Sequence, residues 1–313
     1  MRIIIICSML FFIFLSICTG VFTGPLASAR AFENQEGNPA KSLLYTYKKD
    51  GFSSEANNEE KMRFIDQLLE LTGVKKQVDF ISAHVLAQLP PQRDKFEPEV
   101  YDRLNRILTE FYRPDRLYET VRIYFRDNSN EEQLLNLLNW NFSPLSQKMT
   151  SLDAEAVGPD SAEKMKDFFA KFNSYPSLKE KKPLMERLSK AVGSSELYVK
   201  MVLAATLGFF EVTEPLIPIE FREINRSEFS GMFTAMQKEL EESLNTGVVP
   251  SLLYTYRDVT VEELKKYIDF WESEDGRWFN KITGDSFVEA VVQANRSAAV
   301  GIAEISSPYR KRN

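Results

Sequence analysis

A nine-residue segment of this chain occurs twice, and a repeat of this kind restricts the possible folds more than its composition does. The first copy reads YFRDNSNEE at 124–132, the second reads TYRDVTVEE at 255–263, and Trp140 and Trp271 follow at the same distance. Arg-Asp, a hydroxyl residue, Glu-Glu and Trp recur without a gap. We therefore expect two tandem units that arose by internal duplication.

Each copy also has the pattern of a helix start. Ser129 precedes Glu132 by three residues, and Thr260 precedes Glu263 by three, which is the spacing of a capping box. Apolar residues recur at helical spacing along the chain, and no long stretch alternates with a period of two. The fold class predicted from these patterns is all-α, built from two tandem helical units that could pack as one body.

The order of segments follows from changes in composition and from a second echo between the halves. FIDQL before Gly73 resembles LMERL before Gly193. We expect the last long helix at about 287–305. The expected divisions are a signal peptide at 1–31, a flexible lead-in at 32–58, helical repeat 1 at 59–157, a linker with one helix at 158–182, helical repeat 2 at 183–306 and a basic tail at 307–313.

The N-terminal segment has the three parts of a secretory signal peptide. Arg2 is followed by an apolar run and then by small residues that fit cleavage after Ala29 or Ala31. Two alternatives remain, because about 20 apolar residues could also form an uncleaved anchor, and the residues before Cys18 resemble a bacterial lipobox. We expect a periplasmic or secreted protein, whose membrane contact would come only from a leader that is uncleaved or lipidated at Cys18.

Composition excludes several classes of chemistry and partner. Both cysteines, Cys7 and Cys18, lie in the leader, so the mature chain is expected to have no disulfide or thiol nucleophile. The chain has a net charge of −6, and removal of Arg2 and Arg30 with the leader makes it −8. No nucleic-acid partner is expected, because phosphate binding requires a basic surface.

The second copy resembles a known family over 248–292. It reads YRDVTVEEL at 256–264 and FWES at 270–273, with Gly276 three residues after Ser273. This arrangement is similar to the bacterial envelope family catalogued as domain of unknown function 2059, apparently present here in duplicate. The first copy has Ser143 but no glycine three residues later. The resemblance implies an exported helical protein and assigns no activity.

The residue types needed for most catalytic sites are scarce. His84 is the only histidine, and the chain has no phosphate loop, dinucleotide fingerprint or G-x-S-x-G elbow, so no cofactor, metal or catalytic triad is expected. The acids of the two repeated segments are accounted for by helix starts. An alternative function, a carboxylate-based hydrolase of an envelope polymer, would use the acids of an insertion in the second half: Glu211, Glu214 and Glu220.

Six residues are candidates for binding: Trp140, Trp271, Arg126, Arg257, Leu216 and Ile217. Each tryptophan could pack in the core or form a platform for a partner. Each arginine is expected to complement the end of the preceding helix, with its neighbouring aspartate bridging to the next cap; anion binding is the alternative. Leu216 and Ile217 could pack between the units or form a docking patch. The function favoured is a non-enzymatic binding or interaction module for an envelope protein, peptide or lipid.

Overall fold

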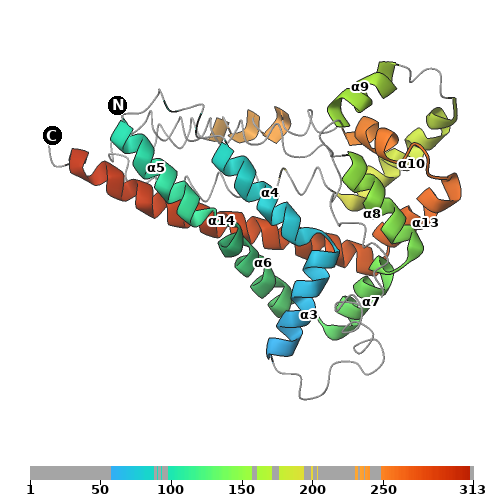
Figure 1. The fold of residues 1–313 in the computed structure, drawn as a ribbon, viewed down its shortest axis with the longest axis horizontal. Coiled ribbons are helices and arrows are strands. Elements are labelled where there is room, and N and C mark those ends of the chain that lie inside the picture. Colours follow the sequence, from blue (N-terminus) through green and yellow to red (C-terminus); the bar gives the residue numbers. More distant parts are fainter. Residues whose placement is uncertain are drawn as a thin grey trace.

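The structure is a computed structural model that describes 58–87, 90, 93, 98–156, 161–170, 176–193, 199, 203, 230–231, 233–235, 237–239 and 248–310. Within these residues the regular secondary structure is helical and includes no strand, which confirms the all-α prediction. Figure 1 shows the helices grouped around one long C-terminal helix.

The first half of the described chain contains six α-helices. These are α3 (Asn58–Leu71), α4 (Val74–Ala87), α5 (Pro98–Phe111), α6 (Pro114–Asn128), α7 (Glu131–Asn141) and α8 (Pro144–Ala156). Proline is the first residue of α5, α6 and α8, where its missing N–H has no helical partner to lose. Gly73 follows α3 with a φ of 78°, a left-handed conformation that glycine adopts without strain.

The second half has a comparable series. It consists of α9 (Ser161–Ala170), α10 (Pro176–Val192), a helical segment at 248–255, α13 (Val261–Trp271) and α14 (Glu274–Arg310). Gly193 follows α10 with a φ of 59°, as Gly73 follows α3. The expected boundary at 182/183 falls inside α10, which continues through Pro183.

The core is assembled along α14. This helix has 37 residues, which corresponds to about 55 Å, and it runs the length of the molecule in Figure 1. Its first turns pack against α7, α10 and α13, and its later turns lie along α5 and α6. Small residues permit the close approach to α5, where the Cβ of an alanine at Gly301 would lie 3.2 Å from Ile107. The buried side of α14 consists of Phe279, Ile282, Phe287, Ala290, Val291, Ala294, Ala298, Ala299 and Ile302.

The expected start of the last helix at about 287 is wrong. The helix begins at Glu274 and carries Gly276 in its first turn. The sequence suggested a break there because glycine and serine are common in turns. Here Gly276 serves packing, since a Cβ at this position would lie 2.1 Å from the carbonyl oxygen of Phe270.

Corresponding helices of the two halves make corresponding contacts. In the first half α3 packs against α7, and in the second half α10 packs against α13. The halves also exchange contacts, because α14 packs against α7 while α8 packs against α13. An approximate two-fold relation between the halves would produce this pattern. The internal duplication itself remains a prediction from the sequence.

The cap of α7 is formed one residue later than the repeat suggests. Asn130 accepts a hydrogen bond from the Gln133 N–H at 2.9 Å, and the Gln133 side chain accepts one from the Asn130 N–H. Ser129 instead donates its hydroxyl to the Phe125 carbonyl at 2.5 Å, so the expected Ser129–Glu132 box is wrong. The Thr260–Glu263 box is confirmed. Asn130 therefore corresponds to Thr260. The segment between the Arg-Asp pair and the cap residue is one residue shorter in the second copy than in the first.

Substitution of the two candidate caps should show this difference. Asn130→Ala is expected to lower the free energy of unfolding by about 1 kcal/mol and to speed hydrogen exchange of the Gln133 amide, which loses its acceptor. Ser129→Ala should leave that amide protected. Urea denaturation and amide exchange measured on both variants test this, and faster exchange of Gln133 in Ser129→Ala alone would contradict the observed cap.

Candidate functional site

Two helix corners face each other where the halves meet. One is the turn between α7 and α8, and the other is the turn between α13 and α14. In the first, Ser143 Oγ accepts a hydrogen bond from the Ser146 N–H at 3.2 Å; in the second, Ser273 Oγ accepts one from Gly276 at the same distance. The first copy thus forms the same serine turn with Ser146 in place of the glycine.

Stacked aromatic rings join the two corners at corresponding positions. Trp140 of α7 lies over Phe270 of α13, with ring centroids 3.9 Å apart and planes inclined by 6°. Both side chains are partly buried against the core and partly exposed. The helix caps align Asn130 with Thr260, one residue away from the alignment of the sequence repeat. The structural counterpart of Trp140 is therefore Phe270 rather than Trp271. Residues related by a two-fold axis meet in this way when they lie beside the axis.

The aromatic contacts continue inward from this pair. Tyr267 lies 6.2 Å from Trp140, and Trp271 lies 5.4 Å from Phe270. Trp271 is only 5% exposed and packs against Phe279 of α14. The structure therefore separates the two tryptophans, because Trp271 is a core residue whereas Trp140 reaches the surface.

A buried carboxyl group lies at the inner end of the cluster. Asp153, in the last turn of α8, is 3% exposed, and its Oδ1 accepts a hydrogen bond from the Tyr256 hydroxyl at 2.7 Å. Burial raises the pKa of Asp153 to about 8, and the bond from Tyr256 opposes this rise. Burial also raises the pKa of Tyr256 and that of Tyr267. All three groups are therefore neutral around pH 7.

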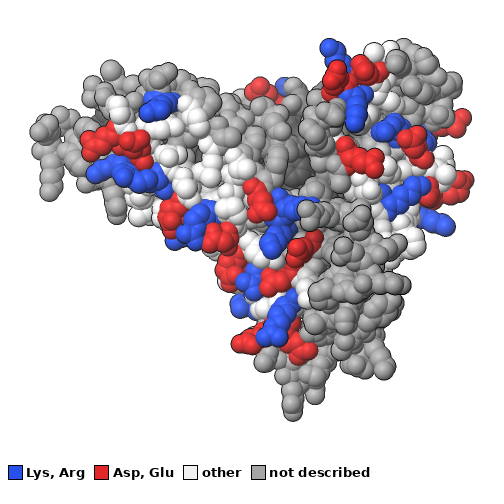
Figure 2. Space-filling model, in the orientation of Figure 1, with Lys and Arg blue, Asp and Glu red and all other residues white. Residues whose placement is uncertain are grey.

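Polar contacts also join the two halves. Lys148 of α8 contacts Glu263 of α13 at 2.7 Å, and Asn136 of α7 donates to Asp275 of α14 at 3.3 Å. Lys148 and then the Thr260 N–H lower the pKa of Glu263, which keeps this acid ionised as a cap. Figure 2 shows acidic and basic side chains interspersed over the described part of the visible face.

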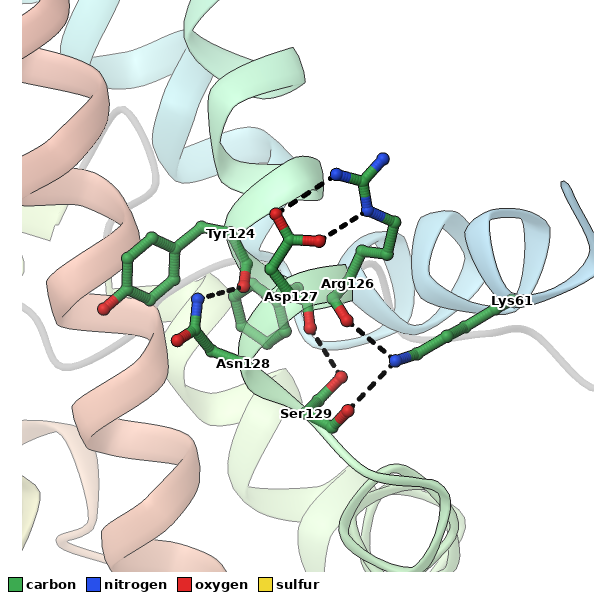
Figure 3. A network of polar contacts seen from close by, with 7 residues as sticks. Lys61, Tyr124, Arg126, Asp127, Asn128 and Ser129 are labelled. Atoms are coloured by element: carbon green, nitrogen blue, oxygen red, sulfur yellow. Dashed lines mark hydrogen bonds and ion pairs between the residues drawn. The ribbon is translucent and has the colours of Figure 1, made fainter. Parts of the chain in front are cut away.

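The two predicted arginines have different roles. Arg126 pairs with the adjacent Asp127 at 2.7 Å, and the carbonyls at the end of α6 are bound by Lys61 instead (Figure 3). The Lys61 ammonium lies 2.7 Å from the Arg126 carbonyl oxygen and 3.0 Å from that of Ser129. Arg126 lies in the last turn of α6, as expected, but its side chain pairs with Asp127. The carbonyls at this end are instead bound by a lysine of α3.

Arg257 matches the first part of the prediction, whereas Asp258 pairs with Arg257 at 3.3 Å, as Asp127 pairs with Arg126. The Arg257 guanidinium donates to the Tyr254 carbonyl at 2.7 Å, at the end of the 248–255 segment. Lys181 of α10 donates to the Arg257 carbonyl at 2.5 Å, as Lys61 of α3 does to that of Arg126. Both Arg-Asp turns are thus contacted by a lysine, from α3 in the first half and from α10 in the second. These contacts give the Arg-Asp turns a structural role.

Several other candidates have no described surroundings. Leu216, Ile217 and the insertion acids Glu211, Glu214 and Glu220 lie outside the described residues, as do the leader and Cys18. His84 lies in α4. The described residues contain no group of three or more histidine, cysteine or acidic side chains placed to hold a metal ion.

Sequence reasoning missed the buried acid and the lysine contacts. A signal for Asp153 exists, because it lies four residues after the buried Met149 and so falls on the apolar stripe of α8. Phe270 lay next to Trp271 in the repeat, and the wrong register hid its pairing with Trp140. Lys61 and Lys181 carry no local signal, since their partners are distant in sequence.

Comparison with protein-family models, curated proteins and solved structures finds no match to this chain. The resemblance to the envelope family therefore remains an expectation from the sequence. None of the helices in the described parts of the chain is long and apolar enough to cross a membrane.

Proposed function

We propose that the chain is a non-enzymatic binding module of the bacterial envelope, and that Trp140 and Phe270 form the centre of its contact surface. The stacked pair between the two helix corners carries this proposal. A tryptophan on a phenylalanine gives a rigid apolar surface, and partly exposed aromatic side chains of this kind often dominate the energy of an interface. The polar rim of this surface would come from two contacts between the halves, Lys148 with Glu263 and Asn136 with Asp275.

The described acidic residues near the two corners have structural partners, whereas the acids of the hydrolase alternative, Glu211, Glu214 and Glu220, lie outside the described residues. Glu263 caps α13 and pairs with Lys148, and Asp127 pairs with Arg126. Asp153 has the raised pKa expected of a general acid, but its burial and its bond to Tyr256 keep a polymer from reaching it. The partner proposed is an envelope protein, peptide or lipid, in keeping with the signal-peptide pattern of the leader.

Variants that change the aromatic pair test this function. Crosslinking in the native cells, followed by mass spectrometry, is expected to recover a specific partner with the wild-type protein. Trp140→Ala and Phe270→Ala should reduce its recovery at least about tenfold, as loss of a hot-spot residue does. Val300→Ala is the matched control, because Val300 is 56% exposed on the later turns of α14. Equal recovery with all three variants, shown to be folded by circular dichroism, would contradict the proposed surface.

A further inference from the structure

The carboxyl group of Asp153 lies where three helices meet. Asp153 belongs to α8, Tyr256 directly follows the 248–255 segment, and Tyr267 belongs to α13. The Tyr256 ring is fully buried and lies 5.8 Å from that of Tyr267. The hydrogen bond from Tyr256 to Asp153 therefore connects the last helix of the first half with the second half.

The same junction is built in the other half without a carboxyl group. The counterparts of Asp153 and Tyr256 are Thr283 of α14 and Phe125 of α6. Thr283 is 1% exposed, and its hydroxyl makes no hydrogen bond to another described residue. Phe125 packs edge-on against Phe279 at 6.4 Å. Apolar packing thus serves here in place of the bond between Asp153 and Tyr256, so the acid is not required to assemble this kind of junction.

Among the described residues, the groups that interact with the Asp153 carboxyl carry no positive charge. They are Tyr256 and Tyr267, whose pKa values burial raises, so that both are neutral around pH 7. Arg257, next to Tyr256, is directed to the Tyr254 carbonyl. Lys148, on the same helix as Asp153, is engaged by Glu263. Among the described residues, a carboxylate formed at this position would have one hydrogen bond, from Tyr256, and no cation, which is unfavourable in a buried environment.

We propose that Asp153 is a proton-dependent contact, which holds α8 against Tyr256 and α13 as a neutral acid and releases α8 when its proton passes to solvent base. The inference goes beyond the binding function and does not depend on it. Release of α8 would also affect the contact surface around Trp140, because α8 starts at the corner that follows this residue.

The direction of the pH dependence follows from proton linkage. With α8 packed, burial holds the pKa of Asp153 near 8, and with α8 released it returns toward the ordinary 3.8. The contact is therefore strongest below the lower pKa, weakens as the pH rises, and stops weakening above about 8. Between the two values the population of the released form grows about tenfold per pH unit.

Hydrogen exchange of the full chain, followed by mass spectrometry between pH 5 and 9, tests this proposal. Asp153→Asn keeps an oxygen for the Tyr256 hydroxyl but cannot ionise. Exchange over 144–156 in the wild-type protein, divided by exchange in Asp153→Asn at the same pH, is expected to rise about tenfold per unit up to about pH 8. Exchange over 114–128, the α6 helix, should show no such rise. A constant ratio over 144–156, or an equal rise in α6, would overturn the proposal.

A second variant keeps the test decisive if Asp153→Asn does not fold. Tyr256→Phe removes the hydrogen bond that lowers the Asp153 pKa. The rise in exchange over 144–156 should then continue to a higher pH than in the wild-type protein. A merely weakened helix contact would raise exchange equally at every pH, and that result, or a shift to lower pH, would overturn the proposal.

Discussion

Replacement of Gly276 by alanine is expected to lower the free energy of unfolding by about 3 kcal/mol. Helix propensity alone predicts the opposite sign, because alanine in a helix is favoured over glycine by up to about 1 kcal/mol. Packing prevails because the new Cβ would lie 2.1 Å from the Phe270 carbonyl oxygen and 2.7 Å from the Trp271 Cα. These are backbone atoms at the end of α13, so the corner must open to admit the methyl group.

Gly231→Ala is the matched control for this substitution. Gly231 is helical, and a Cβ there would meet nothing within 4 Å. Its replacement should leave stability unchanged or raise it by up to about 1 kcal/mol. Urea denaturation followed by circular dichroism measures both variants under one condition. A Gly276→Ala protein as stable as the wild type would show that α13 and α14 are not packed as closely as the corner indicates.

Trp271→Ala is expected to destabilise the protein by 3 to 5 kcal/mol, on the order found for large aromatic side chains in cores. Trp271 is 5% exposed, and its ring contacts those of Tyr267, Phe270 and Phe279. Removal of the indole would leave a cavity between α13 and α14 that these rings could fill only in part. Trp271→Phe should retain most of the stability.

Trp140→Ala is the informative comparison, because the repeat makes the two tryptophans look equivalent. Trp140 is partly exposed and contacts Phe270 and Tyr267 from one side. Its loss should cost about 1 to 2 kcal/mol, well below the cost at Trp271. Thermal and urea unfolding of both variants supply the values. Equal losses at the two positions would contradict the separation of a core tryptophan from a surface one.

The sequence predicted the local features of the fold well. Helix type follows from apolar spacing and the absence of alternation, and Gly73, Pro98 and Pro114 lie at helix ends, where glycine and proline are common. These signals are local, so they can be interpreted without knowledge of the tertiary contacts. The pattern around Thr260 and Glu263 is of the same kind, and the structure confirms it.

Register and long-range contacts could not be predicted in the same way. The gapless repeat placed the cap of α7 at Ser129, but Asn130 is also a good cap, and it brings Leu134, Leu137 and Leu138 to the buried side. Tertiary packing determines which of two adjacent candidate residues, Ser129 or Asn130, forms the helix cap. The Lys61 contact with the end of α6 and the Tyr256 contact with Asp153 join residues far apart in sequence. Neither partner has a pattern that identifies the other.

The most direct measurement of the proposed contact surface is photocrosslinking in the native cells, with benzoylphenylalanine at position 140 and, as a control, at position 123. Ile123 is an exposed apolar residue on α6, a different helix from those that carry the aromatic pair, with 37% of its surface accessible. If Trp140 and Phe270 bind a partner, light should produce one discrete adduct from position 140 and none of the same mass from position 123. No adduct from position 140, or the same adducts from both positions, would contradict a binding surface between the two helix corners.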